Sequence, residues 1–272
     1  MRRRGDQRPM ISFSSTQLDA WIVAFVFPLT RILALLTTAP VFSNLALSVQ
    51  ARLILGLAIS LALTPALPPL PTIAPDSWVG MLVLGQQVLI GVCLGFTLRL
   101  IFTAVDVAGE LIGLQMGLGF ASFYDPQTAS QTPVMAEFLS LVATLLFLSL
   151  NGHLLTLSML AESFTLLPIS ATPFAAKGFA AMLSWAATIF STGVFLALPL
   201  IAALLIANIA LGVLARIAPS LNIFAVGFPV TIVAGFSVLA LSLPYMGAAL
   251  ERLYESGFAA LYGVMRAGGA LP

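Results

Sequence analysis

The hydrophobic positions of this chain fall into long runs separated by short polar or proline-containing connections. A bilayer core of about 30 Å requires roughly 20 apolar residues in a helix that crosses it. Runs of this kind lie at Leu18–Ala39, Leu45–Leu67, Trp78–Leu98, Val134–Leu160, Phe179–Leu214 and Ile223–Met246. The pattern predicts an all-α integral membrane protein with about six apolar helical segments.

Prolines mark the connections and interrupt several of the runs. The segments Pro65–Pro71 and Leu167–Pro173 cannot continue a helix and predict stiff, extended turns. Three prolines lie inside apolar runs, at Pro28, Pro199 and Pro229. The uncharged stretch 178–215 has 38 residues and would measure about 57 Å as one straight helix. We therefore expect it to bend, break or project beyond the bilayer, with Pro199 as the breakpoint.

The segment Gly109–Pro126 is too polar and glycine-rich for a lipid-facing helix, yet too apolar for a solvated loop. Gly109, Gly113 and Gly117 are four residues apart, so a helix here would present a bare ridge to a second backbone. Asp125-Pro126 ends any helix. Irregular backbone among membrane spans persists where protein buries it or where it lines a watery cavity. We expect the segment to pack inside an assembly or to obstruct a passage.

Two interpretations are open for the large side chains of this segment, Met116, Phe120, Phe123 and Tyr124. Methionine adapts to irregular surfaces, and aromatic rings beside glycines can form a hydrophobic constriction that blocks water and ions by dewetting. Alternatively, these side chains are simply buried in a helix bundle. For a second glycine pair, Gly91 and Gly95, close helix packing is favoured over a role in transport.

Ionisable side chains within or beside apolar runs are candidates for function, because a charge at membrane depth is costly unless it is paired or hydrated. They are Arg31, Asp106, Glu110, Asp125, Glu137 and Glu162. Asp106 and Glu110 are four residues apart and would repel each other unless Arg31 or Arg99 lies between them. Structural pairing and a conducting role are both possible for these residues.

Composition restricts the possible functions. Hydrophobic residues make up 60% of the 272 positions and charged residues only 8%, too few to cover a soluble domain of this size. A net charge of +1 offers nothing for nucleic acid to bind. The single cysteine, Cys93, excludes an intrachain disulfide framework. We expect no cofactor and no metal.

Enzymatic functions lack the necessary residues. The single histidine, His153, follows Asn151-Gly152 at an expected turn. The chain has no His-Glu-x-x-His, Gly-x-Ser-x-Gly or Gly-x-x-x-x-Gly-Lys motif, so the motif-based zinc, serine-nucleophile and phosphate sites are not predicted. We expect a non-enzymatic protein whose energy source lies in another protein.

The amino-terminal residues 1–9 form a basic extension with arginines at positions 2, 3, 4 and 8. They resemble the charged region of a signal peptide. The following run is long, contains Arg31 and leads into Pro40 where a cleavage site might be sought. An uncleaved first span is therefore expected, and Met10 is a candidate for the natural start.

Two motifs, 113–126 and 208–229, resemble the FliR family of flagellar biosynthetic proteins, which belong to the type III export apparatus. The first reads Gly-Leu-Gln-Met-Gly-Leu-Gly-Phe-Ala-Ser-Phe-Tyr-Asp-Pro, and the second begins with Asn-Ile-Ala-Leu-Gly and ends with Val-Gly-Phe-Pro. The order and spacing of the apolar runs also agree from about Ile11 to Ala260. Residues 1–9 do not fit, and the short carboxyl-terminal tail lacks the partner domain that is fused to some relatives.

The resemblance implies a core subunit of the flagellar export gate in the bacterial inner membrane, at the flagellar basal body. In the family, one such chain joins several copies of FliP-like and FliQ-like subunits as tilted helical hairpins in a hetero-oligomer. An FlhB-like switch protein is a further expected partner, and unfolded flagellar subunits are the cargo. Residues 10–175 would be the FliP-like part and residues 176–272 the FliQ-like hairpin and tail.

The resemblance also assigns site residues. The plug segment, Gly109–Pro126, would close the channel. Its expected plug residues are Glu110, Gly113, Gln115, Met116, Gly117, Leu118, Gly119, Phe120, Phe123, Tyr124 and Asp125. Residues expected to pack helices or contact partners are Gly91, Gly95, Gly109, Asn208, Gly212, Arg216, Pro219, Asn222, Gly227 and Pro229.

Three alternatives are kept open. A virulence-type secretion homologue would share the architecture but export a different cargo. A small-solute secondary transporter would use proline-broken helices to form a site near the bilayer midplane. A pure scaffold would use its glycine ridges for docking only.

Overall fold

The computed structural model describes residues 15–43, 47–68, 73–120, 133–218 and 223–269, and every regular element in these ranges is a helix. The longer helices are α1 (Ser15–Thr38), α2 (Val49–Leu63), α3 (Trp78–Gln115), α5 (Val134–Ser149), α6 (Gly152–Leu166), α7 (Ala176–Ile217) and α8 (Ile223–Gly269). Two 3₁₀ turns are η1 (Thr64–Ala66) and η2 (Leu118–Phe120). The all-α prediction is confirmed.

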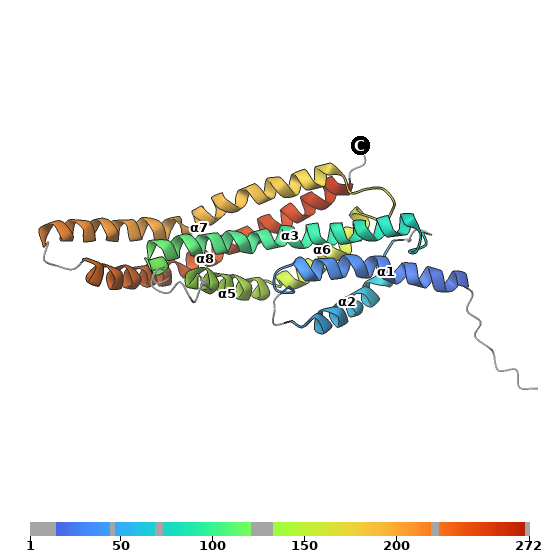
Figure 1. Ribbon diagram of the computed structural model, residues 1–272, viewed down its shortest axis with the longest axis horizontal. Helices are drawn as coiled ribbons and strands as arrows, with labels where there is room; N and C mark the ends of the chain where they lie inside the picture. The colour runs from blue at the N-terminus through green and yellow to red at the C-terminus, as the bar shows by residue number, and fades with distance from the viewer. Residues whose placement is uncertain (1–14, 44–46, 69–72, 121–132, 219–222, 270–272) are drawn as a thin grey trace, which may run out of the picture.

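The molecule is elongated, and α3 runs lengthwise through its centre (Figure 1). α1 packs on the first half of α3, while α5, α7 and α8 pack on α3 along the remainder. α7 and α8 lie side by side over much of their length (Figure 1). The long central helix therefore connects the amino-terminal helices to the carboxyl-terminal pair.

Serine side chains begin two of these helices. The Ser48 hydroxyl accepts a hydrogen bond from the amide of Ala51 at 3.2 Å at the start of α2. The Ser77 hydroxyl accepts one from the amide of Gly80 at 2.9 Å at the start of α3. Each bond satisfies one of the four amides that the first turn of a helix leaves without a backbone partner.

Two helix boundaries differ from the prediction. The third run does not end at Leu98, because α3 continues as one helix to Gln115. The fourth run, predicted as one span, is two helices, α5 and α6, that meet at 67°. Asn151 adopts a left-handed conformation there, with φ 57°, and such a residue ends a helix.

The internal prolines do not break their helices. α1 includes Pro28 and α7 includes Pro199, while α8 includes both Pro229 and Pro244. Outright breaks at these prolines are therefore wrong, but α7 changes direction along its length, as expected for a stretch that must bend or project beyond the bilayer (Figure 1). A proline removes one backbone hydrogen bond, and the remaining bonds and neighbouring helices keep the backbone helical in apolar surroundings.

Several helices are long and apolar enough to cross a bilayer. Within the described ranges, four helices satisfy length and composition criteria for a span, and a fifth span results if α5 and α6 count as one bent unit. The 42 residues of α7 and the 47 of α8 correspond to about 63 and 70 Å. Both helices must tilt strongly or extend past a hydrocarbon layer of about 30 Å.

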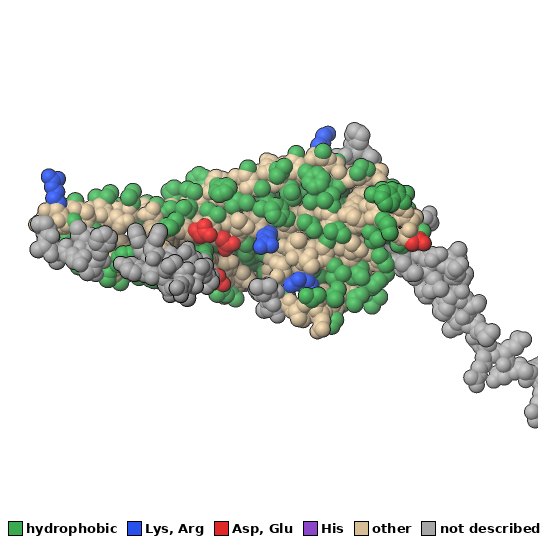
Figure 2. Space-filling model, in the orientation of Figure 1, with side chains coloured by type: hydrophobic (Ala, Val, Ile, Leu, Met, Phe, Trp, Pro, Cys, Tyr) green, Lys and Arg blue, Asp and Glu red, His purple; other side chains and the backbone are tan. Residues whose placement is uncertain are grey.

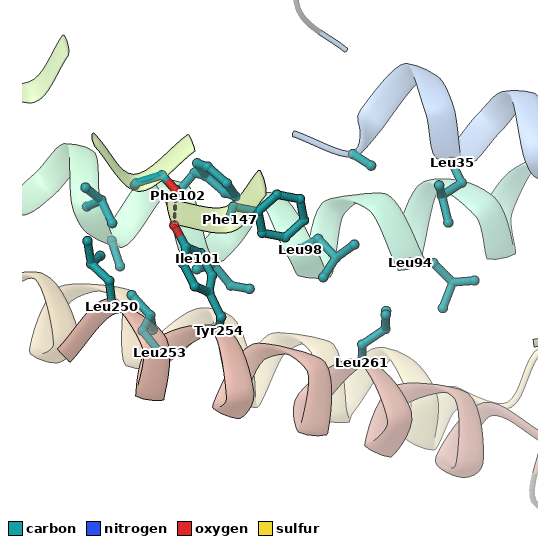
Figure 3. Packing of buried hydrophobic residues seen from close by; sticks show 14 of the residues in the cluster. Leu35, Leu94, Leu98, Ile101, Phe102, Phe147, Leu250, Leu253, Tyr254 and Leu261 are labelled. Carbon is teal, nitrogen blue, oxygen red and sulfur yellow. Dashed lines mark hydrogen bonds between the residues drawn. The ribbon is translucent and has the colours of Figure 1, made fainter. Parts of the chain in front are cut away.

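The apolar core lies where α3, α5 and α8 meet. The Phe147 ring lies 5.6 Å from the Phe102 ring and 5.5 Å from the Tyr254 ring, both edge to face. The Tyr254 hydroxyl donates a hydrogen bond to the Ala143 carbonyl of α5. Figure 3 shows Tyr254 reaching from α8 to this point, with the bond drawn as a dashed line. These contacts join three helices that are distant in the sequence.

Candidate functional site

The first part of the plug segment is helical. α3 continues through Gly109, Glu110 and Gly113 and ends at Gln115, so the first of the expected plug residues belong to a helix. A glycine costs a helix only about 1 kcal/mol relative to alanine, and packing against α5 offsets that cost. A Cβ atom on Gly109 would lie 2.6 Å from the Ala136 amide nitrogen, so only glycine lets the two helices approach this closely.

Gly117 redirects the chain after the end of α3. Its φ is +80°, a left-handed conformation that glycine adopts without steric cost, and its amide donates a hydrogen bond to the Leu114 carbonyl at 3.1 Å. A Cβ atom on Gly117 would lie 3.0 Å from the Phe228 ring of α8. Substitution at this position would therefore strain the backbone and press on α8.

Met116 ties the end of α3 to α8. Its side chain is fully buried and lies against Gly235, where an added Cβ atom would come within 2.6 Å of the Met116 Cγ. The Thr231 hydroxyl donates to the Met116 carbonyl at 3.2 Å. For Met116, the geometry is that of burial within the helix bundle, so this side chain anchors the start of the irregular segment.

The remaining plug residues are described only in part. Leu118 and Gly119 are half-buried and belong to η2 together with Phe120. Gln115, the last residue of α3, is also half-buried. Three predicted plug residues lie outside the described residues: Phe123, Tyr124 and Asp125. The predicted aromatic constriction stays a prediction.

The glycine pair of α3 lies against α1. A Cβ atom on Gly91 would approach the Ala34 Cβ to 2.7 Å, and one on Gly95 would approach the Ala39 amide nitrogen to 2.8 Å. Both separations are far below van der Waals contact. The spacing of four residues therefore places two bare positions on the face of α3 that α1 covers.

An acidic patch lies where α3 meets α5. Asp106 hydrogen-bonds with the Ser140 side chain, and Glu110 and Glu137 are near enough to repel its charge. Figure 2 shows acidic side chains gathered in a small area of a largely apolar face. Of the two cations predicted to act here, Arg99 is close enough to attract Asp106, whereas Arg31 is engaged elsewhere.

Arg31 is fully buried between α1, α3 and α6. Its Nε donates to the Gln87 Oε1 at 2.8 Å. Its two terminal nitrogens donate to the Ser163 carbonyl and the Leu167 carbonyl, both at 2.8 Å, and its guanidinium lies 4.3 Å from the centre of the Phe164 ring. Within the described ranges it has no carboxylate partner. The Ser163 carbonyl, which also accepts the Leu167 amide, the Leu167 carbonyl and the negative end of the α6 dipole supply the compensating charge instead.

The second motif lies on α7 and the start of α8. Asn208 is half-buried, whereas Arg216 is exposed in the last turn of α7. An added Cβ atom on Gly212 would meet nothing within 4 Å. Gly227 is half-buried and Pro229 exposed, while Pro219 and Asn222 lie outside the described residues. Gly212, Arg216 and Pro229 are therefore on surface that the described part of the chain leaves uncovered.

The residues considered for metal or catalytic chemistry are dispersed. His153 is half-buried in the first turn of α6, as the predicted turn implies, and Glu162 is half-buried near the other end of the same helix. Cys93 is buried in α3. In the described ranges, no group of three His, Cys, Asp or Glu side chains is arranged to hold a metal ion.

Thr231 and Gly235 were not identified from the sequence, although they hold Met116 in place. Their spacing of four residues is the small-x-x-x-small pattern of close helix packing, and this sequence pattern could have indicated them. The pattern identifies a packing face but not its partner, so the contact with the end of α3 requires the structure.

Comparison with known proteins adds a family assignment. The model of the family "Bacterial export proteins, family 1" matches residues 22–257. The flagellar biosynthetic protein FliR of Pectobacterium carotovorum is 46% identical over 92% of this chain and 95% of its own length. The Escherichia coli protein of the same name is 41% identical over the same shares, and the Aquifex aeolicus protein is 32% identical over 88% of this chain and 93% of its own length. The chain belongs to the FliR family of flagellar biosynthetic proteins, within family 1 of the bacterial export proteins.

Proposed function

We propose that this chain is a core, non-enzymatic membrane subunit of the flagellar protein export gate and that the plug segment closes the channel. Relatives with matching length carry the name of a flagellar biosynthetic protein, and the family model is one of bacterial export proteins. The apolar helices supply the membrane part of such a subunit. The cargo in this proposal is unfolded flagellar subunits.

The anchor at Met116, where the plug segment leaves α3, carries the proposal. Met116 is buried against α8, and the Thr231 hydroxyl bonds to its carbonyl. Gly117 then turns the chain out of the α3 axis. A closure has to stay attached to a rigid element while its free part moves, and this arrangement provides the attachment. The large apolar side chains that follow supply a seal that excludes water by dewetting.

Partner subunits are expected to cover the exposed apolar faces of α7 and α8. We assign FliP-like and FliQ-like subunits to these faces, with an FlhB-like switch protein as a further partner. Residues 176–272 include the α7–α8 pair, whose two helices pack on each other, and this pairing supports a FliQ-like hairpin. Residues 10–175 form the FliP-like part in the same proposal.

Deletion of Leu118–Tyr124 tests the closure. The deleted residues follow the anchor at Met116, so the purified complex should keep its composition while its ion conductance in planar bilayers rises. Replacing the same seven residues with glycine and serine is the matched control for chain length, and it should also leak. Conductance equal to that of the parent complex in both variants would show that the segment is not the closure.

Two other functions give different results in the same experiment. A pure scaffold would lose assembly after the deletion without ever producing a leak. A small-solute transporter would show solute-dependent activity when the chain is purified alone. Purification of the parent chain from membranes, followed by mass measurement of the intact complex, separates both from an export-gate subunit.

A further inference from the structure

A pocket lies between α8 and the bend that joins α5 to α6. Its volume is about 360 Å³, at the lower end of the range of about 300–1,000 Å³ for pockets that hold organic ligands. Aromatic and aliphatic side chains form the walls, with two carboxylates among them. The residues that define its chemistry are Phe147, Leu155, Glu251, Tyr254, Glu255 and Phe258.

The two carboxylates lack a compensating charge. Glu251 and Glu255 are one helical turn apart on the same face of α8, where like charges repel, and both are exposed. No residue in the described ranges forms an ion pair with either of them. The Tyr254 hydroxyl does not serve them, because it donates to the Ala143 carbonyl.

The combination of rings and carboxylates selects a cation. Carboxylates bind ammonium and guanidinium groups through charge-assisted hydrogen bonds, and the half-buried Phe258 is the aromatic lining residue whose ring a cation can still approach. The pocket is too apolar for a hydrated metal ion but suits a cation on a hydrocarbon stem. Lysine and arginine have this form, since their stems lie along apolar surface while their charged ends reach a polar group.

The surroundings of the pocket favour a protein side chain as the source of this cation. Leucine side chains beside the pocket are exposed: Leu148, Leu150, Leu154 and Leu155. They offer an apolar area on which the residues next to the cation can pack. The two glutamates directly follow the uncharged stretch 223–250 of α8, so they lie where the most apolar part of this helix ends.

We propose that this pocket binds a lysine or arginine side chain from a neighbouring subunit of the export complex. The inference rests on the proposed function, because it requires that the chain assembles with other subunits. The cation separates Glu251 from Glu255, and its stem packs against Leu155 and Phe258, the two large apolar lining residues of the pocket named above that keep exposed surface.

Charge reversal in the co-expressed complex tests the pocket. The double variant Glu251→Lys/Glu255→Lys should reduce the yield of intact complex about tenfold, which corresponds to about 1.4 kcal/mol of lost interaction. The double variant Glu251→Gln/Glu255→Gln keeps the size of both side chains and should lower the yield in the same direction. Arg252→Glu is the matched control, because Arg252 lies on the same helix but does not line the pocket; its yield should match the parent.

A photo-reactive amino acid in place of Leu155 identifies the occupant. Cross-links should join it to a peptide of another subunit that carries a lysine or arginine within one helical turn of the linked residue. Reversing that cation to glutamate should restore assembly of the double-lysine variant. Cross-links to lipid or to this chain alone, or failure of the reversal to restore assembly, would overturn the proposal.

The outcomes separate this inference from the proposed function. If the parent chain purifies without other subunits, the proposed function fails. If the parent assembles and both double variants assemble equally well, the pocket proposal alone is wrong. If the double-lysine variant does not accumulate in membranes, the double-glutamine variant decides, because it introduces no charge into the pocket.

Discussion

The central helix α3 and the carboxyl-terminal pair α7 and α8 have similar apolar sequences but different surroundings. Each helix has an apolar stretch of 18 residues that is long enough to cross a membrane. In α3, 67% of this stretch is buried within the chain, whereas only 22% of it is buried in α7 and 17% in α8. Within the chain, α3 uses its apolar surface to bind α1, α5, α7 and α8. The other two helices leave most of theirs uncovered.

This difference shows which surfaces are left for lipid or other subunits. Large apolar side chains on α7 that stay exposed include Leu205, Ile206, Ile209, Val213 and Ile217. Contiguous apolar surface of this kind marks an interaction site or a membrane-facing surface. Variants on α3 and its neighbours should therefore affect the folding of the chain itself, while variants on the uncovered faces should affect assembly.

The largest effect is expected for Arg31→Ala compared with Arg216→Ala. Loss of the Arg31 guanidinium leaves the Leu167 carbonyl and the Gln87 Oε1 without this donor, and it removes one of the donors to the Ser163 carbonyl, which keeps the Leu167 amide. Hydrogen bonds to a charged group are each worth about 1.5–3 kcal/mol, so the stability of the chain should fall by about 3 kcal/mol or more. Arg216 is exposed, and its removal should change stability by less than about 0.5 kcal/mol.

Unfolding of the purified chains in detergent, followed by tryptophan fluorescence, measures both variants. Equal midpoints for Arg31→Ala and Arg216→Ala would contradict the structural role of the buried guanidinium.

A smaller effect is expected for Gly109→Leu compared with Gly212→Leu. The new side chain at position 109 would collide with the α5 backbone at Ala136, and overpacking costs about 1–3 kcal/mol. At position 212 it meets open space within the chain, so the isolated chain should stay as stable as the parent. Yield of the purified complex should then decrease for Gly212→Leu if a partner covers this face.

Thermal stability of the isolated chain and complex yield are measured in parallel for the two glycine variants. If Gly212→Leu destabilises the isolated chain as much as Gly109→Leu does, the contrast between covered and uncovered helices is wrong.

The smallest effect is expected for Tyr254→Phe compared with Tyr245→Phe. The first substitution removes the hydrogen bond to the Ala143 carbonyl and should cost about 0.5–1.5 kcal/mol. Tyr245 is 80% exposed, so loss of its hydroxyl should have no measurable effect on the isolated chain. Denaturant unfolding in detergent measures the stability of both variants. If Tyr245→Phe were the less stable of the two, the stabilising role given to the Tyr254 hydroxyl would be wrong.

Local spacing predicted the parts of the structure that depend on neighbouring residues. The four-residue glycine pair Gly91 and Gly95 indicated a close helix contact, and the hydrophobic runs predicted an all-helical membrane protein. The predicted helix-breaking effect of Pro199 and Pro229 was too large. The helix propensity of one residue does not include the packing that keeps a long helix continuous. The prediction also missed the bend at Asn151, where one left-handed residue divides an apolar run.

The candidate site was predicted less completely. The glycine pattern located the segment after α3, but the burial of Met116 depends on Thr231 and Gly235 of a helix more than a hundred residues away. The partners of Arg31 are mainly backbone carbonyls, which no side-chain motif encodes. The expected pairing of Arg31 with the Asp106 and Glu110 carboxylates therefore named the wrong chemical group.

The position of Arg31 has a consequence for biosynthesis. Its acceptors at Ser163 and Leu167 follow it by 132 and 136 residues. At a synthesis rate of about 5–20 residues per second, Arg31 leaves the ribosome roughly 7 to 27 seconds before the carbonyls that accept its guanidinium. The first helix must keep that cation hydrated during this interval, so its final docking waits for α6 and the amino-terminal half of the protein is completed only after most of the chain has been translated.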